Sequence, residues 1–227
     1  AELSSGRTVV YVHYEEPDAA STIERLRILG IGDAVMAERL RFLAPESKLG
    51  ASDWLADHLA ARPSLVVHDG VNEALVLNGL PVDLEGWSTF RRVLVMPFLR
   101  AGAAVLACDH VPMSNDGTRI DAYGSVHKGA AINGARFQIE SKDPFGKGLR
   151  GVSNVFVTKD RPGHLRARGR ATKTVNKTRL GTMVLDSADP FTPPSLMLYA
   201  PRDDDGTAAA TLDESVQSDL QERVLAV

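Results

Sequence analysis

Three apolar runs of the sequence each end in acidic or imidazole side chains. These ends are Glu15-Glu16, His68-Asp69 and Asp109-His110. If the runs are parallel strands, their carboxyl ends meet at one edge of a sheet, where open α/β proteins bind their ligands. A single acid after a strand is more often a helix cap or turn former. Three such ends at one edge indicate a functional site.

These residue types suit phosphoryl transfer to water. That reaction needs Mg²⁺ near the β- and γ-phosphates, a group that orients the attacking water, and cations that neutralise developing charge. Asp69 follows the apolar Leu65 to Val67 and has the form of an acid that supports a metal ion. Glu15 could orient or deprotonate the water, and His110 could contact the γ-phosphate.

A pair of cations provides a second candidate for anion binding. Lys159 and Arg161 lie two residues apart at a predicted strand end, so both could point the same way and bind one anion. A solvated hairpin tip is the alternative. Arg166, Arg168 and Arg170 continue the alternation, so the same ribbon could equally meet a phosphate backbone.

The bulk composition sets broad limits. The chain has 227 residues, 44% of them hydrophobic, which is enough for one domain with an appendage. A net charge of -3 gives no global attraction to nucleic acid, so DNA contact would need the local basic stretch Lys159 to Arg179. A lone Cys108 excludes an internal disulfide and a cysteine-based zinc cluster, and suits the cytoplasm. No apolar run reaches the roughly 20 residues that span a membrane.

The first half of the chain is predicted to alternate strands with helices. We expect strands at Thr8 to Tyr14, Leu40 to Leu43, Leu65 to Asp69 and Ala103 to Cys108, and helices at Asp18 to Leu29, Ser52 to Ala61 and Leu84 to Arg100, the last bent at Pro97. Such alternation implies right-handed crossovers and a parallel sheet. The near-continuous apolar character of the first strand fits a sheet covered on both faces.

After Asn115 the pattern changes to short strands between Gly, Pro and Asp turns. The predicted strands are Ala135 to Ser141, Asn154 to Thr158, Leu165 to Arg170, Thr182 to Asp186 and Ser195 to Tyr199. This pattern is typical of antiparallel pairing. The fold class predicted from the pattern is therefore α/β, with a C-terminal antiparallel extension.

Several runs of the sequence occur in the order of a known family. They are GRTVVYVHYEE, ERLRILG, LVVHDG, GAAVLACDHV, YGSVHKGAAINGARFQIE and GVSNVFVTKDRPGHLRARG, between about Gly6 and Arg170. Together they resemble the RecA-fold, AAA-type ATPases of the RepA-like hexameric replicative helicase group, found in phage and plasmid replication proteins and behind primase-polymerase domains.

The resemblance implies ATP hydrolysis coupled to DNA remodelling or unwinding in replication, on a RecA-like sheet. It implies ATP and Mg²⁺ as cofactors, a ring homo-oligomer, hexameric in this group, and single-stranded DNA as partner. The residue roles that it implies are Glu15 as catalytic glutamate, Asp69 as the Walker B aspartate that holds Mg²⁺ through water, His110 as sensor, Lys159 and Arg161 as fingers reaching a neighbouring subunit's nucleotide, and Lys128 as a DNA or phosphate contact.

Two departures from the family pattern stand out. No G-x-x-x-x-G-K-[S/T] occurs, so the loop whose amides cradle phosphates is missing, and Pro112-Met113 follows His110 where a basic residue is expected. Ala1 to Gly6 is typical of the frayed end of a helix that runs into a buried strand. We therefore expect the chain to begin inside a domain whose phosphate-binding loop lies upstream.

The expected organisation has three parts. Residues 1–170 form a partial RecA-like core without the loop, and residues 171–200 form the β extension. Residues 201–227 begin with a polar linker, Pro201 to Gly206, and enter a further helical module with a helix at Leu212 to Val224.

Two alternatives stay open. A metal-dependent hydrolase could use zinc or manganese held by side chains of the strand ends, namely His13, His68, Asp69, Asp109 and His110. His13 and His68, however, lie inside apolar strands, which favours core histidines. The other alternative is a non-catalytic module that assembles on a ring or on DNA.

Overall fold

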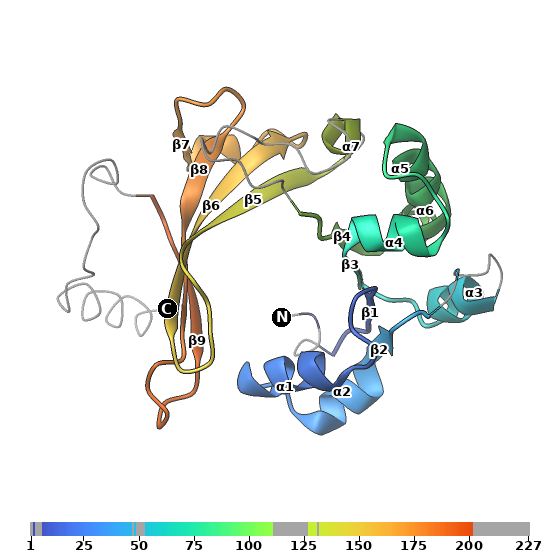
Figure 1. Ribbon diagram of the computed structural model, residues 1–227, viewed down its shortest axis with the longest axis horizontal. Coiled ribbons are helices and arrows are strands. Elements are labelled where there is room, and N and C mark those ends of the chain that lie inside the picture. Colours follow the sequence, from blue (N-terminus) through green and yellow to red (C-terminus); the bar gives the residue numbers. More distant parts are fainter. Residues whose placement is uncertain are drawn as a thin grey trace.

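The computed structural model describes residues 2, 6–46, 48, 53–110, 127–130 and 132–201. It contains a four-stranded parallel sheet in the order β2-β1-β3-β4 and a five-stranded antiparallel sheet in the order β5-β6-β8-β7, with β9 paired to β8. Most helices gather around the parallel sheet, and the antiparallel sheet forms the other side of the molecule (Figure 1).

All four predicted parallel strands are confirmed. They are β1 (Val9–His13), β2 (Leu40–Leu43), β3 (Leu65–Asp69) and β4 (Ala104–Ala107). β1 and β3 occupy the centre, and their register places Val10 opposite Val66 and His13 opposite Asp69. Because β1 and β3 are rich in Val, they suit the buried centre of a sheet.

One face of the parallel sheet carries the main core. Val10, Val12 and Val66 are fully buried there, under Phe98 of α6 (Met96–Arg100) and side chains of α3 (Asp53–Ala60). A second cluster joins α4 (Val71–Leu77) to α5 (Leu84–Phe90). The opposite face is less covered within the described residues, since Leu106 of β4 is 51% exposed. Coverage of both faces, as the sequence suggested, is therefore incomplete in this part of the chain.

The predicted long helix from Leu84 to Arg100 is present but changes its winding. α5 begins under the Asp83 carboxylate, which accepts the amides of Glu85 and Gly86 at 2.9 and 3.0 Å. A π-helical turn, Arg91–Val95, then separates α5 from α6. Pro97 has no N–H to continue the α-helical bonding, and the wider turn accommodates it.

Three helices were not predicted. They are α2 (Asp33–Arg39), α4 and α7 (His127–Ala130). Each has seven residues or fewer, too short for an apolar period to show. The predicted helix after Asp18 is confirmed as α1 (Ala20–Ile28), and the Asp18 carboxylate accepts the Ala20 amide at 2.8 Å.

The antiparallel sheet is confirmed, with longer strands than expected. Its members are β5 (Ala135–Asp143), β6 (Arg150–Asp160), β7 (Arg170–Ala171), β8 (Thr178–Asp186) and β9 (Ser195–Tyr199). The strand predicted at Leu165 to Arg170 is wrong. That segment forms a 3-10 turn, Arg166–Arg168, because the Asp160 carboxylate accepts the amides of Gly163, Leu165 and Arg166 and folds the chain back.

Some predicted features lie outside the described residues. These are Pro112-Met113, the linker beyond Pro201 and the helix at Leu212 to Val224. None of the helices in the described part of the chain combines the length and apolar character that a bilayer crossing requires.

The packing predicts where the fold is most sensitive. Replacing the fully buried Phe98 by Ala should lower the free energy of unfolding by about 3–5 kcal/mol, because a cavity opens between α6 and the sheet. Val76→Ala on α4, where Val76 is 66% exposed, should change it by less than about 0.5 kcal/mol. Urea titration measures both, and equal losses would contradict this placement of the core.

Candidate active site

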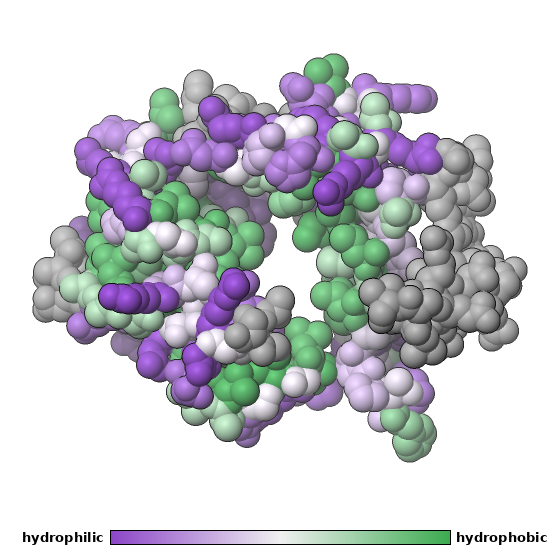
Figure 2. All heavy atoms as spheres, turned by 180° about the vertical axis from the view of Figure 1, so that it is seen from behind, coloured by the Kyte–Doolittle hydropathy of each residue, from purple (hydrophilic) through white to green (hydrophobic). Residues whose placement is uncertain are grey.

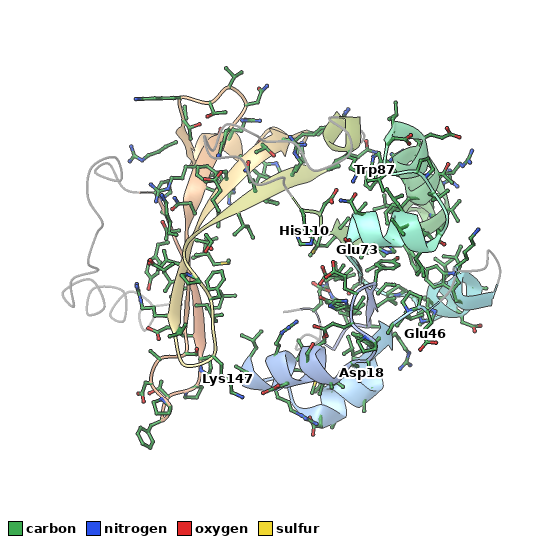
Figure 3. The ribbon with its side chains drawn as sticks, viewed as in Figure 1. Asp18, Glu46, Glu73, Trp87, His110 and Lys147 are labelled. Carbon is green, nitrogen blue, oxygen red and sulfur yellow. The ribbon has the colours of Figure 1, made fainter. Side chains whose placement is uncertain are left out.

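The carboxyl ends of β1, β3 and β4 converge at one edge of the parallel sheet. The Tyr14 amide donates to the Asp69 carbonyl at 2.7 Å, and the Cys108 amide donates to the His68 carbonyl at 2.9 Å. These bonds extend the sheet beyond the strands and hold the three following segments side by side. Figure 3 shows Glu73 and His110 near each other, on the side facing the antiparallel sheet.

Asp69 sits at the end of β3 within a set of local donors. The Tyr11 hydroxyl donates to its Oδ2 at 2.7 Å, and His13 Nε2 lies 3.9 Å from the same oxygen. Burial, with help from Asp69, raises the pKa of Tyr11, so this hydroxyl keeps its proton. Burial and the neighbouring Asp69 also raise the pKa of Cys108 to about 11. Asp69 is joined to Gly70 by a cis peptide bond.

His13 organises the turn that carries the first acidic pair. Its Nδ1 accepts the amides of Glu15 and Glu16 at 3.3 and 3.1 Å, which leaves the proton on Nε2. Nε2 faces the carboxylates of Glu16, at 3.7 Å, and Asp69. The buried ring therefore fixes the backbone from which Glu15 projects.

Glu15 and His110 meet at the rim of the edge. Glu15 Oε1 lies 3.7 Å from His110 Nε2, and both side chains remain open to solvent, at 47% and 76% exposure. Gly70 lies directly beneath them. A Cβ at position 70 would stand 3.4 Å from Glu15 Oε1 and 2.8 Å from Glu73 Oε2. The small Gly70 thus leaves room for both carboxylates, and a larger residue would displace the Glu73 side chain.

Glu73 is a site residue that the sequence reasoning missed. It lies in the first turn of α4, which follows Gly70, and its Oε2 is buried without a hydrogen-bond partner among the described residues. An acid three residues after a helix N-cap is a known capping position, and that signal could have identified it. The structure places this second carboxylate beside Glu15.

Asp109 is held by the predicted contact residue Lys128. Lys128 Nζ lies 2.9 Å from Asp109 Oδ2 and donates to Asn72 Oδ1 at 2.5 Å. Burial raises the pKa of Asp109, and the Lys128 ammonium opposes that rise. Because Lys128 is itself buried, it ties α7 to the end of β4 and to α4.

The predicted finger residues lie at the end of β6. Lys159 Nζ donates to the Gly129 carbonyl of α7 at 2.8 Å, and the Arg161 amide donates to the Gly134 carbonyl at 3.2 Å. Partial burial, then the neighbouring cations Arg161 and Arg136, lower the pKa of Lys159. The Arg161 side chain is exposed. The structure therefore brings Glu15 and His110 together and holds Lys159 against α7.

The two strand histidines are buried, as expected for core residues. His68 is fully buried, and the Tyr14 hydroxyl lies 2.8 Å from its Nδ1. Its ring packs edge-on against Phe90, with centroids 5.2 Å apart. Within the ranges that the structure describes, no three His, Cys, Asp or Glu side chains are arranged to hold a metal ion.

Comparisons with known proteins show similarity in structure. No protein-family model matches the sequence, and no curated protein matches it. The KaiC-like protein PH0186 from Pyrococcus horikoshii OT3 superposes with a TM-score of 0.52 at 13% identity, over 86% of this chain and 76% of that one.

Two further solved structures align more loosely. The flagellar accessory protein FlaH from Methanocaldococcus jannaschii gives a TM-score of 0.47 at 12% identity, over 88% of this chain and 79% of that one. The RadB recombinase gives 0.39 at 14% identity, over 70% and 79% respectively. The similarity to the KaiC-like protein, with the observed topology, confirms the predicted RecA-like α/β fold class, and it extends to the fold alone.

The buried His68 predicts a pH dependence of stability. Burial lowers its pKa to about 4, below the value of about 6.5 expected in the unfolded chain. The unfolded state therefore binds more protons between these values, and stability falls as pH falls from about 6.5 towards 4. From pH 7.5 to 5, this residue should account for a loss of about 2 kcal/mol in the free energy of unfolding.

Chemical denaturation across this pH range measures the effect. His68→Gln should show a smaller fall in stability than the wild type, whatever its stability at pH 7.5. His164→Gln, at an exposed position, should retain the wild-type dependence. If His68→Gln also retains it, His68 does not titrate as a buried neutral ring.

Proposed function

We propose that this chain is the core of an ATPase that hydrolyses Mg²⁺–ATP at the edge formed by β1, β3 and β4. The observation that carries the proposal is the convergence at that edge of Glu15 and His110, 3.7 Å apart above Gly70, next to Asp69. We further propose that hydrolysis serves DNA remodelling or unwinding in replication, as the resemblance to RepA-like helicases implies, in a cytoplasmic protein.

The arrangement suits distinct roles for the residues. Glu15 is half exposed and can reach a water molecule, so it can orient that water or accept its proton. His110 adjoins it and can contact the phosphate under attack. Mg²⁺, when bound, neutralises charge on the transferred phosphate. Carboxylate oxygens suit this ion, and Asp69, whose Oδ2 accepts the Tyr11 hydroxyl, brings a carboxylate to this edge.

The 227 residues contain no phosphate-binding motif, and we propose that a further segment of polypeptide supplies this loop. Two features of β4 support this part of the proposal. Among the described strands β4 pairs only with β3, and Leu106 is 51% exposed. An open, apolar strand edge of this kind can accept a further strand.

We also propose that the protein assembles into a homo-oligomeric ring, which is a hexamer in the RepA-like helicases. In this ring, Arg161 reaches the nucleotide of a neighbouring subunit. Its backbone is held by Gly134 while its side chain stays exposed. Lys159 is the weaker candidate of the two, because its ammonium group donates to Gly129 in its own chain.

A non-catalytic module that assembles on a ring or on DNA is the second candidate. The missing phosphate-binding motif favours it for the 227 residues taken alone. We expect the 227 residues to bind ATP more weakly than about 1 mM, the upper end of ordinary enzyme values, because they lack the loop. Robust hydrolysis by the 227 residues would overturn the need for a further loop.

Substitutions of Glu15 and Asp69 should cause different defects. In the polypeptide that includes the phosphate-binding loop, Glu15→Gln should lower kcat about 100-fold or more while preserving ATP affinity, because it removes only the group that orients water. Asp69→Asn should also weaken Mg²⁺-dependent binding. Steady-state hydrolysis and calorimetric titration separate these effects.

A matched control is available on the same chain. Glu46→Gln makes the same chemical change at an exposed position away from the edge (Figure 3), and it should leave hydrolysis unchanged. If Glu15→Gln and Asp69→Asn also hydrolyse ATP at the wild-type rate, the edge is not the catalytic site.

The proposed finger predicts complementation between subunits. Arg161→Ala should lower turnover about 1000-fold and spare nucleotide binding, because a cation supplied in trans acts on the transition state. Mixed with Glu15→Gln subunits, it should regain part of the activity, since some interfaces then combine an intact Glu15 with an intact Arg161. Arg92→Ala, at an exposed position on the π-helical turn, should have no effect. Mixed oligomers without recovery would exclude the trans role.

A further inference from the structure

Positive charge is concentrated in one segment of the antiparallel sheet. Between Asp160 and Asp186 the chain has seven of its 26 Lys and Arg residues and no Asp or Glu. The chain as a whole carries a net charge of -3. The segment includes the 3-10 turn, β7 and most of β8. Its charge is thus opposite to that of the rest of the protein.

Three of these cations have structural roles. Arg166 donates to Thr178 Oγ1 at 3.0 Å and to the carbonyls of Thr158 and Asn176 at 3.1 Å, which joins the turn to the ends of β6 and β8. Lys177 is buried, pairs with Glu140 and lies 4.3 Å from the centre of the Phe156 ring.

Arg179 is the third, and it donates to Asn154 Oδ1 and Thr182 Oγ1 at 3.1 and 2.9 Å. These bonds fix the backbone that carries the remaining cations. Binding to that backbone therefore requires little additional ordering.

The remaining cations on β7 and its flanks are exposed, and one of them, Arg170, also donates to the Pro201 carbonyl at 3.4 Å. We name Arg168, Arg170 and Lys173 the basic rim. Hydrophilic side chains gather along the upper edge of the molecule, where Figure 1 places β7 and β8 (Figure 2). Asp160, which precedes this segment, has both carboxylate oxygens occupied by backbone amides.

Like charges also face each other across the strands at this end. Arg170 of β7 lies opposite Arg179 of β8, and Arg136 of β5 lies opposite Lys159 of β6. Like charges directly opposite each other destabilise a sheet. The crowding of Lys159 by Arg161 and Arg136 contributes to the lowered pKa of Lys159. Intramolecular bonds account for Arg166, Lys177 and Arg179. The additional exposed cations beside them increase this repulsion, and an anionic partner would relieve it.

We propose that the basic rim binds the phosphodiester backbone of DNA. The surface offers cations on a fixed backbone, which suits phosphate contacts that position a strand and carry no sequence preference. This inference deepens the DNA-directed part of the proposed function. It assigns DNA contact to residues separate from Glu15, Asp69 and Arg161, so binding can be measured without nucleotide.

The test uses the full 227-residue chain and a fluorescein-labelled 30-nucleotide oligo-dT, followed by anisotropy at several salt concentrations without ATP. The triple variant Arg168→Ala, Arg170→Ala, Lys173→Ala should bind about tenfold more weakly at low salt. Its plot of log affinity against log salt should be shallower by about 2, because up to three phosphate contacts are lost.

The matched control removes the same charge elsewhere. Arg92→Ala, Arg100→Ala, Lys142→Ala changes three exposed cations outside the rim and should keep the wild-type affinity and salt slope. The rim variant should also melt no lower than the wild type, because it relieves the pairing of Arg170 with Arg179. Equal loss in both triple variants would show general charge attraction and overturn the proposal, as would unchanged binding of the rim variant.

Two further arms identify the source of the phosphate. A 30-base-pair duplex in place of oligo-dT distinguishes duplex from single-stranded DNA, and binding of either through the rim supports the proposal. Vesicles containing phosphatidylserine test an anionic membrane instead. If only the vesicles bind, and the rim variant abolishes that binding, the surface is a membrane contact and the proposal is wrong. None of these binding measurements depends on ATP hydrolysis. A negative result would therefore contradict DNA binding by the basic rim and leave the proposed ATPase activity untouched.

Discussion

The parallel pairing of β1 with β3 is the constraint on which the rest of the site depends. It places His13 opposite Asp69 and continues past the strands through the bond from the Tyr14 amide to the Asp69 carbonyl. The segments that follow β1 and β3 therefore begin at the same edge of the sheet. His13 can then fix the following turn, and Glu15 reaches the space above Gly70. A one-residue slip would move each of these side chains to the opposite face.

The link between the two sheets is the second structural element of this account. α7 joins them through two lysines: Lys128 from α7 to Asp109, and Lys159 from β6 to the Gly129 carbonyl. At the other end, Lys147 of the β5–β6 turn contacts Glu24 of α1 at 3.0 Å. Because Lys128 is buried and Lys147 exposed, the α7 link is the stronger of the two. Lys128 and Lys159 thus connect β6, through α7, to the edge that carries Asp109.

The strands β1 and β3 were predictable from sequence because β-branched runs contain their own signal. The short apolar strands β2 and β9 match their predicted bounds. The meeting of Glu15 with His110 followed from the rule that parallel strands end at one edge. Glu73 and the engagement of Lys128 did not follow, because each depends on a short helix without an apolar period. The strand predicted at Leu165 to Arg170 failed for another reason: three amides bound by Asp160 outweighed a local alternation of residue types.

In the proposed ATPase, the edge of β1, β3 and β4 receives a metal–nucleotide complex. The most direct test is to titrate Mn²⁺–ATP, with Mn²⁺ as a paramagnetic substitute for Mg²⁺, into the ¹⁵N-labelled chain and follow the broadening of amide signals. Because broadening reports even weak binding, the missing loop does not prevent the measurement. The account predicts broadening centred on Glu15, Gly70, Glu73 and His110, with β5 to β9 unaffected. Broadening centred elsewhere, or identical broadening by Mn²⁺ without ATP, would contradict it.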